Sequence, residues 1–537
     1  NAGRPVEARK AVELALQRAP GDAEALTMRA SIAHAHGNLE SALRDYSRAL
    51  ASQPRYVDAR IARAGILLDL KRDSEARVDI DYLQQNAPSD PRGAYLRAVY
   101  YSRIGDSVKE QAAMQDVART LSLLAPEFVD GSDQLLFLGG LAHHALGEYE
   151  RAKTYLGRYL EKHPRATGAR KLMASILLAE RQYTRAIAML QPALQASPGD
   201  TKVMTMLGEA YMAMGNHGKA TSLFQEAAST RNSAEVQTGL GISLLSAGQD
   251  EAGFDALQRA YKASASRQTG VPLALALLKR GEAKQAVTIV EAIVKNEPRN
   301  ISAQNLLGVA RLAAGDLAGA RAAYVAAIKI EPNFYVAHLN LARLDEADGK
   351  ITEARQRYLG ILKAAPNHMD AMLELARLEE STGRVAEAIR LLDKARNQRA
   401  QDIRPHLALY ALYMRQGQPR QALDAARNAQ ATAPDNPAAL MAMADAQIAL
   451  GMSDQSRVLL HRLTQIVAFD PARLTQVAVR QIRIGDYESA RYTLGKAQLA
   501  DAGFLPARLV QVRLETQSGN LVEAEKLASA LLAQTGS

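Results

Sequence analysis

The chain has 537 residues, a net charge of +9 and no cysteine. Without cysteine there is no thiol nucleophile and no zinc–thiolate site. The absence of cysteine is compatible with both an oxidising and a reducing compartment. The positive charge favours acidic partners but is dilute over this length, and no Lys/Arg block or RNA-recognition motif indicates a nucleic-acid partner. No uninterrupted apolar run approaches the length of a membrane span.

One glycine recurs along the chain at a nearly constant interval. From Gly281 to Gly519 every step is 34 residues, and Lys71 and Arg181 stand in phase with the series. A period of 34 residues is typical of a helix–turn–helix repeat that stacks into a solenoid. The recurring glycines are Gly3, Gly37, Gly105, Gly147, Gly215, Gly248, Gly281, Gly315, Gly349, Gly383, Gly417, Gly451, Gly485 and Gly519.

Other residue types fall into register when this glycine is numbered position 15 of each repeat. Position 8 is Gly or Ala in 13 of 15 repeats, and position 20 is nearly always Ala. Small side chains at both positions let two helices approach closely, and a bulky residue at position 24, such as Phe224 or Tyr324, fills the space that they leave. Proline is frequent at position 32, where it ends the second helix.

These columns resemble the tetratricopeptide repeat (TPR) family along nearly the whole chain. The resemblance implies an all-α fold, a right-handed superhelical solenoid of about fifteen helix–turn–helix repeats, whose concave groove is lined mainly by first helices. Residues 1–20 form a partial repeat, its second helix only, and repeats follow over 21–126 and 133–537. Neither end offers a polar capping helix, so we expect a piece of a longer protein, truncated at both ends.

The step from Gly105 to Gly147 is eight residues longer than its neighbours. We expect a longer second helix there, followed by an inserted loop over residues 127–132. Two interpretations are open, because insertions in repeat proteins map to loops that are often on a functional face. The favoured one is a tolerated surface insertion; the other is a kink in the solenoid or a partner contact.

No catalytic or metal site is predicted. The chain has no phosphate-binding loop, nucleophile elbow or zinc-helix motif, and we expect no enzyme and no cofactor. His34 with His36, and His143 with His144, are spaced to face different sides of a helix. Tyr155 and Tyr159 share a face, which packing explains better than sugar stacking. Asp79, Asp81, Glu379 and Glu380 are interpreted as ordinary surface.

Candidate binding residues come from positions 2, 5, 9 and 12 of the first helix, which line the groove in the TPR family. These columns predict a groove that is apolar in its middle and carries arginines towards the C-terminal end. The candidates are Tyr95, Phe137, Lys171, Ile242, Leu275, Asn305, Leu312, Arg343, Arg377 and Arg404.

Arg343 and Arg377 both occupy position 9, so we expect them on adjacent repeats facing the same way. Two such guanidinium groups can hold a carboxylate or an acidic polymer. The favoured alternative is that each pairs with Glu346 or Glu380 three residues on along its own helix. The carboxylate clamp of chaperone-binding TPRs is absent, because Ser175 follows Lys171 where Asn is needed. An asparagine ladder is absent too.

Several stretches resemble a narrower family, the TPR-repeat lipoprotein of the bacterial PEP-CTERM/exosortase system. They include residues 145–150, 155–160, 169–174 and 207–211, and the region from Asn305 to Arg343. The resemblance implies a periplasmic, outer-membrane lipoprotein that acts as a scaffold in exopolysaccharide synthesis or export, with protein partners or an acidic polymer in its groove. Its lipid anchor would lie outside this sequence. The alternatives are a cytosolic adaptor and the accessory solenoid of a larger glycosyltransferase-type enzyme.

Overall fold

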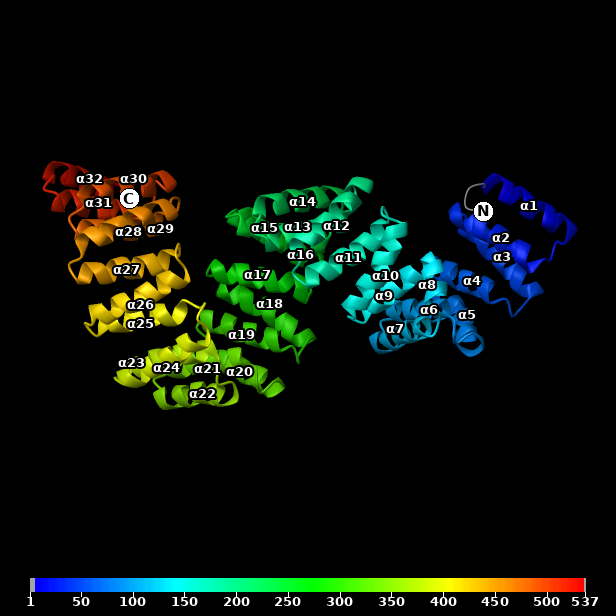
Figure 1. The fold of residues 1–537 in the computed structure, drawn as a ribbon, viewed down its shortest axis with the longest axis horizontal. Helices are drawn as coiled ribbons and strands as arrows, with labels where there is room; N and C mark the ends of the chain where they lie inside the picture. Colours follow the sequence, from blue (N-terminus) through cyan, green and yellow to red (C-terminus); the bar gives the residue numbers. More distant parts are fainter. Residues whose placement is uncertain (1–4, 536–537) are drawn as a thin grey trace. The chain divides into compact units, whose positions relative to one another are not determined.

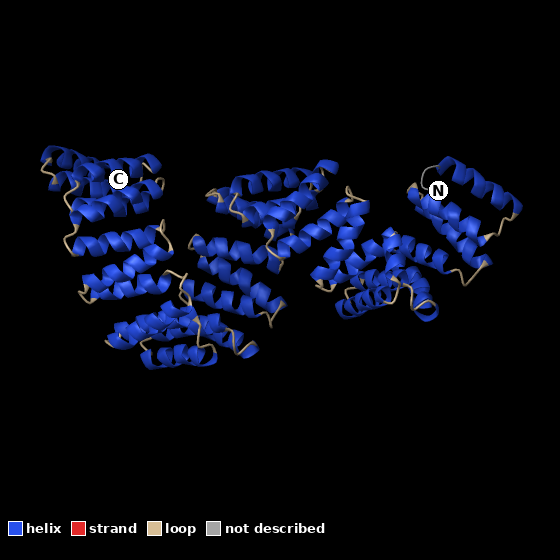
Figure 2. Cartoon of the chain, viewed as in Figure 1, coloured by secondary structure: helices blue, strands red, loops and turns tan. Residues whose placement is uncertain are grey.

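The computed structural model describes residues 5–535, and this part of the chain consists of 32 helices and the loops that join them, with no strand (Figure 2). The predicted all-helical repeat architecture is confirmed. Fifteen helix pairs follow the first helix, and one short helix is inserted between two pairs. The chain divides into two compact units, Asn1–Ala276 and Leu277–Ser537, with the boundary inside α17.

In the first unit, consecutive helices run back and forth and pack on their neighbours in the sequence (Figure 1). Its helices are α1 (Pro5–Arg18), α2 (Ala23–Ala35), α3 (Leu39–Ser52), α4 (Val57–Asp69), α5 (Asp73–Asn86), α6 (Pro91–Arg103), α7 (Ser107–Ser122), α8 (Pro126–Gly131), α9 (Asp133–Ala145), α10 (Tyr149–Lys162), α11 (Thr167–Ala179), α12 (Tyr183–Ala196), α13 (Thr201–Ala213), α14 (His217–Thr230), α15 (Ala234–Ser246), α16 (Asp250–Ala263) and the start of α17 (Arg267–Lys279).

The second unit has the same organisation. Its remaining helices are α18 (Ala283–Asn296), α19 (Ile301–Ala313), α20 (Leu317–Ile330), α21 (Tyr335–Ala347), α22 (Ile351–Ala364), α23 (Met369–Ser381), α24 (Val385–Gln398), α25 (Arg404–Arg415), α26 (Pro419–Thr432), α27 (Pro437–Ala449), α28 (Ser453–Ile466), α29 (Pro471–Arg483), α30 (Tyr487–Ala500), α31 (Leu505–Gln517) and α32 (Leu521–Thr535).

The recurring residue at position 15 forms the turn between the two helices of a pair. Every residue with positive φ in the described chain occupies this position: thirteen glycines, with φ between 66° and 84°, and Lys71 and Arg181, both at 60°. Gly3 lies outside the described residues. At Gly349 the turn has the two hydrogen bonds of a Schellman motif, Gly349 N–H to Glu346 O at 2.9 Å and Lys350 N–H to Asp345 O at 2.8 Å.

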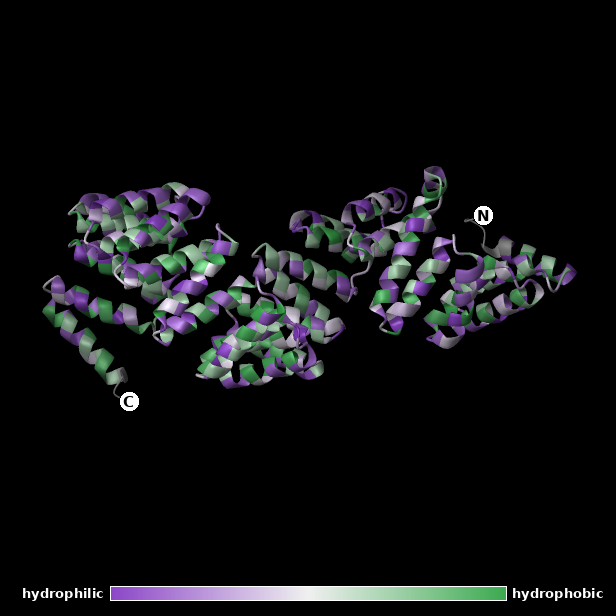
Figure 3. Ribbon diagram, turned by 90° about the horizontal axis from the view of Figure 1, so that it is seen from below, coloured by the Kyte–Doolittle hydropathy of each residue, from purple (hydrophilic) through white to green (hydrophobic). Residues whose placement is uncertain are grey.

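Small residues at position 8 and large residues at position 24 interlock, as the sequence predicts. A Cβ atom added to Gly208 would lie 2.7 Å from the Phe224 ring, and one added to Gly140 would lie 2.5 Å from Leu156. Tyr324 and Tyr358, both at position 24, are completely buried. The core is therefore a series of local clusters between adjacent helices, and hydrophobic and hydrophilic residues alternate along each helix (Figure 3).

The predicted loop over residues 127–132 is wrong, because the structure places the short helix α8 there. Pro126 has a fixed φ that suits the first turn of a helix, and Val129 in the next turn is buried with Leu121 and Leu135. Burial of Val129 gives this segment a packed face, which an exposed loop would lack. The preceding helix α7 has 16 residues instead of the usual 14.

Ion pairs with buried carboxylates tie successive repeats together in the second unit. Arg355 on α22 donates to Glu379 on α23 at 2.6 Å, Arg491 on α30 donates to Glu515 on α31 at 2.9 Å, and Arg321 bonds Asp345 in the same way. Each carboxylate lies 24 residues after its arginine. Glu379 and Asp79, interpreted from the sequence as surface residues, are 3% and 0% exposed, so that interpretation is wrong. Both are tolerated in the interior because arginines satisfy them; Asp79 accepts from Arg60 and Arg63.

No helix in residues 5–535 combines the length and the apolar character that crossing a bilayer requires.

The turn geometry predicts opposite effects of glycine gain and glycine loss. Lys71 and Arg181 are exposed non-glycine residues in the left-handed region, a conformation that costs an L-residue roughly 1–2 kcal/mol. Lys71→Gly and Arg181→Gly should each raise the free energy of unfolding, measured by urea denaturation, by about 0.5–1 kcal/mol after the entropy of glycine in the unfolded chain is subtracted.

The matched control is Gly349→Ala, whose added Cβ meets no atom within 4 Å, so that only the backbone conformation is penalised. It should lower the free energy of unfolding by about 1 kcal/mol and the urea midpoint with it. A lower midpoint for both glycine-gain variants would contradict the prediction that the positive φ of Lys71 and Arg181 reduces stability.

Candidate binding grooves on the first-helix face

The first helices α2, α4, α6 and α9 enclose a groove of about 540 Å³ in the first unit. Its floor contains Tyr95 and Phe137 at position 5 of two successive repeats, and Val99 and Leu141 at position 9. Positions 5 and 9 are one helical turn apart and so lie on the same face of each helix. The structure therefore brings the predicted residues Tyr95 and Phe137 together in one hollow.

The rim of this first groove is charged. Arg92 pairs with Asp58 of the preceding repeat at 2.9 Å and with Asp90 at 2.7 Å, and Asp90 also caps α6 by accepting from Arg92 N–H. Burial raises the pKa of the Tyr95 hydroxyl, and the nearby Asp69 carboxylate raises it further. The groove thus combines an apolar, aromatic floor with a polar edge.

Tyr155 and Tyr159 are used in packing. Tyr155 stacks on His143 with ring centroids 5.3 Å apart, and it lies against Gly139, where any Cβ would collide with its ring. Tyr159 packs on Phe137 at 5.2 Å and on His163 at 4.8 Å. These contacts support the packing interpretation of the two tyrosines over an exposed strip.

A second groove, of about 790 Å³, lies between α13, α15 and the first turn of α17, within the first unit. Ile242, a predicted binding residue, lines it together with Met212 and Phe224. Glu209 and several hydroxyl side chains also line it, so this stretch is more polar than the sequence predicts. Glu209 occupies position 9 of the repeat that contains Gly215, so an inspection of position 9 in every repeat would have identified it.

Lys171 is satisfied within the protein. Its ammonium group donates to Asp200 of the next repeat at 2.8 Å, and Asp200 also caps α13 by accepting from the N–H groups of Lys202 and Val203. Although burial opposes it, the hydrogen bonds from Lys171 and the helix N-terminus lower the pKa of Asp200. This lysine joins two repeats rather than standing open to a ligand.

Leu275, Asn305 and Leu312 lie on the first helices of two successive repeats, Leu275 on α17 and the other two on α19. Leu275 on α17 is 51% exposed and Leu312 on α19 is 40% exposed. Asn305 accepts a hydrogen bond from the Asn340 amide of the following repeat at 3.0 Å. The two leucines are thus open apolar residues, while Asn305 takes part in a contact between repeats.

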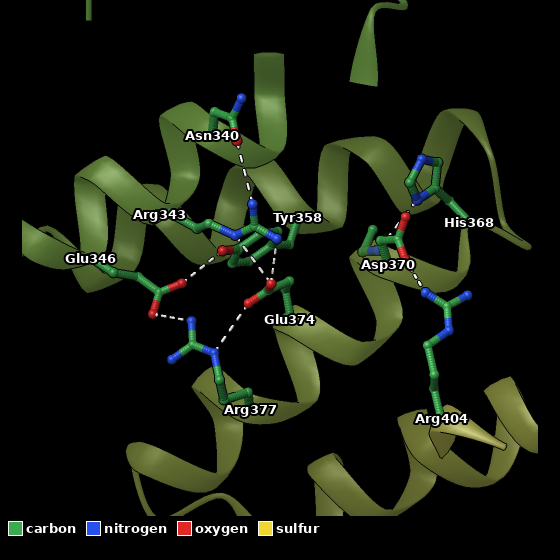
Figure 4. Close-up of polar contacts among 10 residues, drawn as sticks. Asn340, Arg343, Glu346, Tyr358, His368, Asp370, Glu374, Arg377 and Arg404 are labelled. Atoms are coloured by element: carbon green, nitrogen blue, oxygen red, sulfur yellow. Dashed lines mark hydrogen bonds and ion pairs between the residues drawn. The ribbon is translucent and has the colours of Figure 1, made fainter. Parts of the chain in front are cut away.

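Arg343 and Arg377 hold a carboxylate between them, and that carboxylate is Glu374 of the protein itself (Figure 4). Arg343 on α21 donates to Glu374 Oε1 at 2.5 Å, and Arg377 Nε donates to Glu374 Oε2 at 3.1 Å. Arg377 also donates to Glu346 of the preceding repeat, whose other oxygen accepts from the Tyr358 hydroxyl at 2.7 Å.

The favoured expectation of i+3 pairs with Glu346 and Glu380 is therefore wrong. Arg343 and Arg377 each reach a glutamate on the adjacent first helix, because neighbouring first helices lie side by side and a guanidinium can span the distance between them. Glu380 pairs instead with Arg415 of the next repeat through two hydrogen bonds of 2.7 Å. Arg404 pairs with Asp370 of the preceding repeat and with Asp402, both at 2.7 Å.

His143 and His144 have separate partners. His143 bonds Glu148 at 2.8 Å, whereas its neighbour His144 bonds Ser175 at 2.7 Å on another helix, and burial lowers the pKa of His144. Among the described residues, no group of three or more His, Asp or Glu side chains is arranged to bind a metal ion.

Comparison with known proteins places the repeats in a family. Two tetratricopeptide repeat models match the chain, one over residues 1–46, 27–91, 137–201 and 271–333, the other over 177–242, 311–367, 345–412 and 413–476. Together they cover most of the sequence. No curated protein sequence matches it.

Three solved structures show similar folds. Yeast Tom70 is 14% identical, with 87% of this chain and 96% of that chain covered and a TM-score of 0.46. The human IFIT1 dimer with m7Gppp-AAAA is 14% identical over 71% and 90%, with a TM-score of 0.42. The Cut9–Hcn1 hetero-tetramer of APC/C is 13% identical over 86% and 96%, with a TM-score of 0.35. At this identity the likeness concerns the fold alone.

The arginine cluster predicts a pH-dependent stability. Burial raises the pKa of Glu374, but the hydrogen bonds from Arg343 and Arg377 outweigh it and the net pKa is lowered. A carboxyl group with a lowered folded pKa stabilises the fold above its unfolded pKa of about 4.3, and this contribution is lost as the pH falls through the folded value.

Glu374→Gln should therefore lower the melting temperature at pH 7, and the difference from wild type should shrink below about pH 4. Glu353→Gln, an exposed position on α22, is the control and should leave the melting temperature unchanged at both pH values. A pH-independent effect of Glu374→Gln would contradict the ionic role of this carboxylate.

Proposed function

Because the chain belongs to the tetratricopeptide repeat family, we propose that it is a protein-interaction scaffold that holds segments of partner proteins in the grooves of its first-helix face. The observation that carries the proposal is the first groove, where Tyr95, Val99, Phe137 and Leu141 form an open apolar floor in the repeat columns that line such grooves. The proposal assigns no reaction to this chain.

The chemistry of the first groove suits an amphipathic segment. Aromatic and aliphatic side chains at the floor take apolar anchors spaced one helical turn or two extended residues apart. The charged rim, with Asp58, Asp69 and Arg92, fixes the orientation of the segment and keeps water at the edge. A long repeat array then adds further contacts along its length.

A pair of valines in one repeat provides the test. Val99→Glu places a carboxylate on the apolar floor, and partner binding should fall at least tenfold, about 1.4 kcal/mol, because burying an unpaired charge is unfavourable. Val108→Glu makes the same change on α7 of that repeat, where the side chain is 77% exposed, and should bind normally.

The measurement is affinity for partners first captured from the native cell by crosslinking to the wild-type protein. Circular dichroism melts of both variants confirm that the helices remain intact. Equal affinity of the two variants would contradict binding in this groove.

We propose further that the scaffold works at the bacterial cell envelope, as a periplasmic outer-membrane lipoprotein in exopolysaccharide synthesis or export. The support is the resemblance of residues 145–150, 155–160 and 169–174 to the lipoprotein of the PEP-CTERM system. Its partners would then be proteins of the export machinery, or the acidic polymer itself.

Fractionation of cells that express the native gene tests the location. The protein should sediment with outer membranes and be released by detergent. Recovery in the cytosolic fraction would contradict the envelope role and favour the cytosolic adaptor, with the scaffold function left intact.

A further inference from the structure

The second groove is open because two glycines replace side chains above one buried ring. Phe224 on α14 lies beneath the groove, between Gly208 at position 8 of α13 and Gly239 at position 6 of α15. A Cβ atom on either glycine would collide with the Phe224 ring. Other repeats carry larger residues at position 6, such as Leu96 and Leu138, whereas Gly239 lines the groove without a side chain.

The floor and walls of this groove are mainly apolar. Met212 and Ala213 come from the end of α13, Phe224 lies below, and Ile242, which is 39% exposed, faces the opening from α15. Hydroxyl groups of Thr205 and Thr238 stand among them, and both hydroxyl protons are already donated to carbonyls of their own helices. These hydroxyls remain acceptors only.

Glu209 also lines this groove, with its side chain exposed to solvent, and it forms no ion pair within the described chain. Lys202, the cation that lies near it on α13, donates to Glu235 at 2.8 Å, and no hydrogen bond or ion pair joins Glu209 to any other described residue. Glu209 differs in this respect from Glu374 and Glu380 in the second unit, which accept hydrogen bonds from arginines of adjacent repeats.

The surroundings of Glu209 favour the protonated form of its carboxyl group. Burial raises the pKa of Glu209, Lys202 lowers it and Glu235 raises it, with a net upward shift. Because the Glu209 side chain is exposed, solvent screens most of this effect. A cation that entered the groove would favour the ionised form of this carboxyl group.

We propose that the groove of α13, α15 and α17 selects a peptide segment of a partner protein that carries a lysine or arginine, and that this cation pairs with Glu209 while flanking apolar side chains contact Met212, Phe224 and Ile242. The inference rests on the proposed scaffold function and names the kind of peptide segment that the second groove binds. The local charge, Glu209 and Glu235 against Lys202, repels an acidic polymer and attracts a basic side chain.

The experiment pans a phage-displayed library of random dodecapeptides against the whole chain and measures the affinities of enriched peptides by fluorescence polarisation. Peptides that compete with one another and lose binding to Ile242→Glu belong to this groove. We expect them to share one Lys or Arg between apolar residues. Glu209→Gln should weaken them about tenfold or more, the value of a charge-assisted hydrogen bond, and replacing their basic residue with norleucine should abolish the difference between wild type and Glu209→Gln.

Two controls separate binding from folding. Glu226→Gln makes the same change at an exposed position of α14 and should leave affinity within twofold of wild type. Glu209→Gln should melt at the wild-type temperature, because Glu209 is exposed and forms no hydrogen bond or ion pair with another described residue. If Glu209→Gln loses binding without losing stability, Glu209 determines specificity and is not needed for the fold.

Three outcomes would overturn the inference. Peptides of this groove without a basic residue, or with a preference that Glu209→Gln leaves unchanged, would remove Glu209 from recognition and leave the scaffold function standing. Binding of alginate that Ile242→Glu abolishes would assign the groove to a polysaccharide. Failure to enrich any peptide, combined with equal partner binding by the Val99→Glu and Val108→Glu variants, would remove the scaffold proposal itself.

Discussion

One turn residue per repeat, held at positive φ, sets the geometry on which the rest of the structure depends. It ends the first helix with a Schellman motif and starts the second at a fixed angle, so the same columns of side chains meet in every pair. Position 8 then faces position 24, as in Gly208 and Phe224, and the helices close to contact distance. With these positions buried, positions 5 and 9 of the first helix are left facing outward, where Tyr95 and Val99 lie.

The two units use charge in different ways. In the second unit, arginines and glutamates of adjacent first helices satisfy one another, and Glu374 occupies the place between Arg343 and Arg377 that an external carboxylate would need. Glu346 and Glu380 likewise accept hydrogen bonds from arginines of neighbouring repeats. In the first unit, Glu209 faces an open groove with no partner, and Tyr95 and Phe137 form an apolar hollow. A partner segment can pair with a carboxylate that has no partner within the protein, and it can cover an exposed apolar floor.

The sequence predicts the features of this fold that repeat. The period locates every helix pair, and it identifies Lys71 and Arg181 as turn residues although neither is a glycine, because phase outweighs residue preference at a fixed position. The glycine and alanine columns also predict the contact between positions 8 and 24. Helix α8 could not be predicted in this way, because it lies in an insertion that has no counterpart in other repeats, and its formation depends on the tertiary burial of Val129.

The sequence is less informative about side chains that cross from one repeat to the next. Which acid Arg377 contacts depends on the offset between adjacent first helices, which the period does not specify. The buried pair of Arg355 and Glu379 follows a 24-residue spacing that recurs in the chain, so that signal was present. Predicting which acid is left without a partner, as Glu209 is, requires every neighbouring cation to be placed first.

If the chain is the proposed scaffold, the phase of the turn residue determines which residues of a repeat meet a partner. Photo-crosslinking in the native cell, with benzoylphenylalanine placed in turn at each residue of α6 and α7, tests it directly. The account predicts partner adducts at Tyr95 and Val99, one helical turn apart, and none at Val108. Adducts confined to the exposed face of α7 would contradict it.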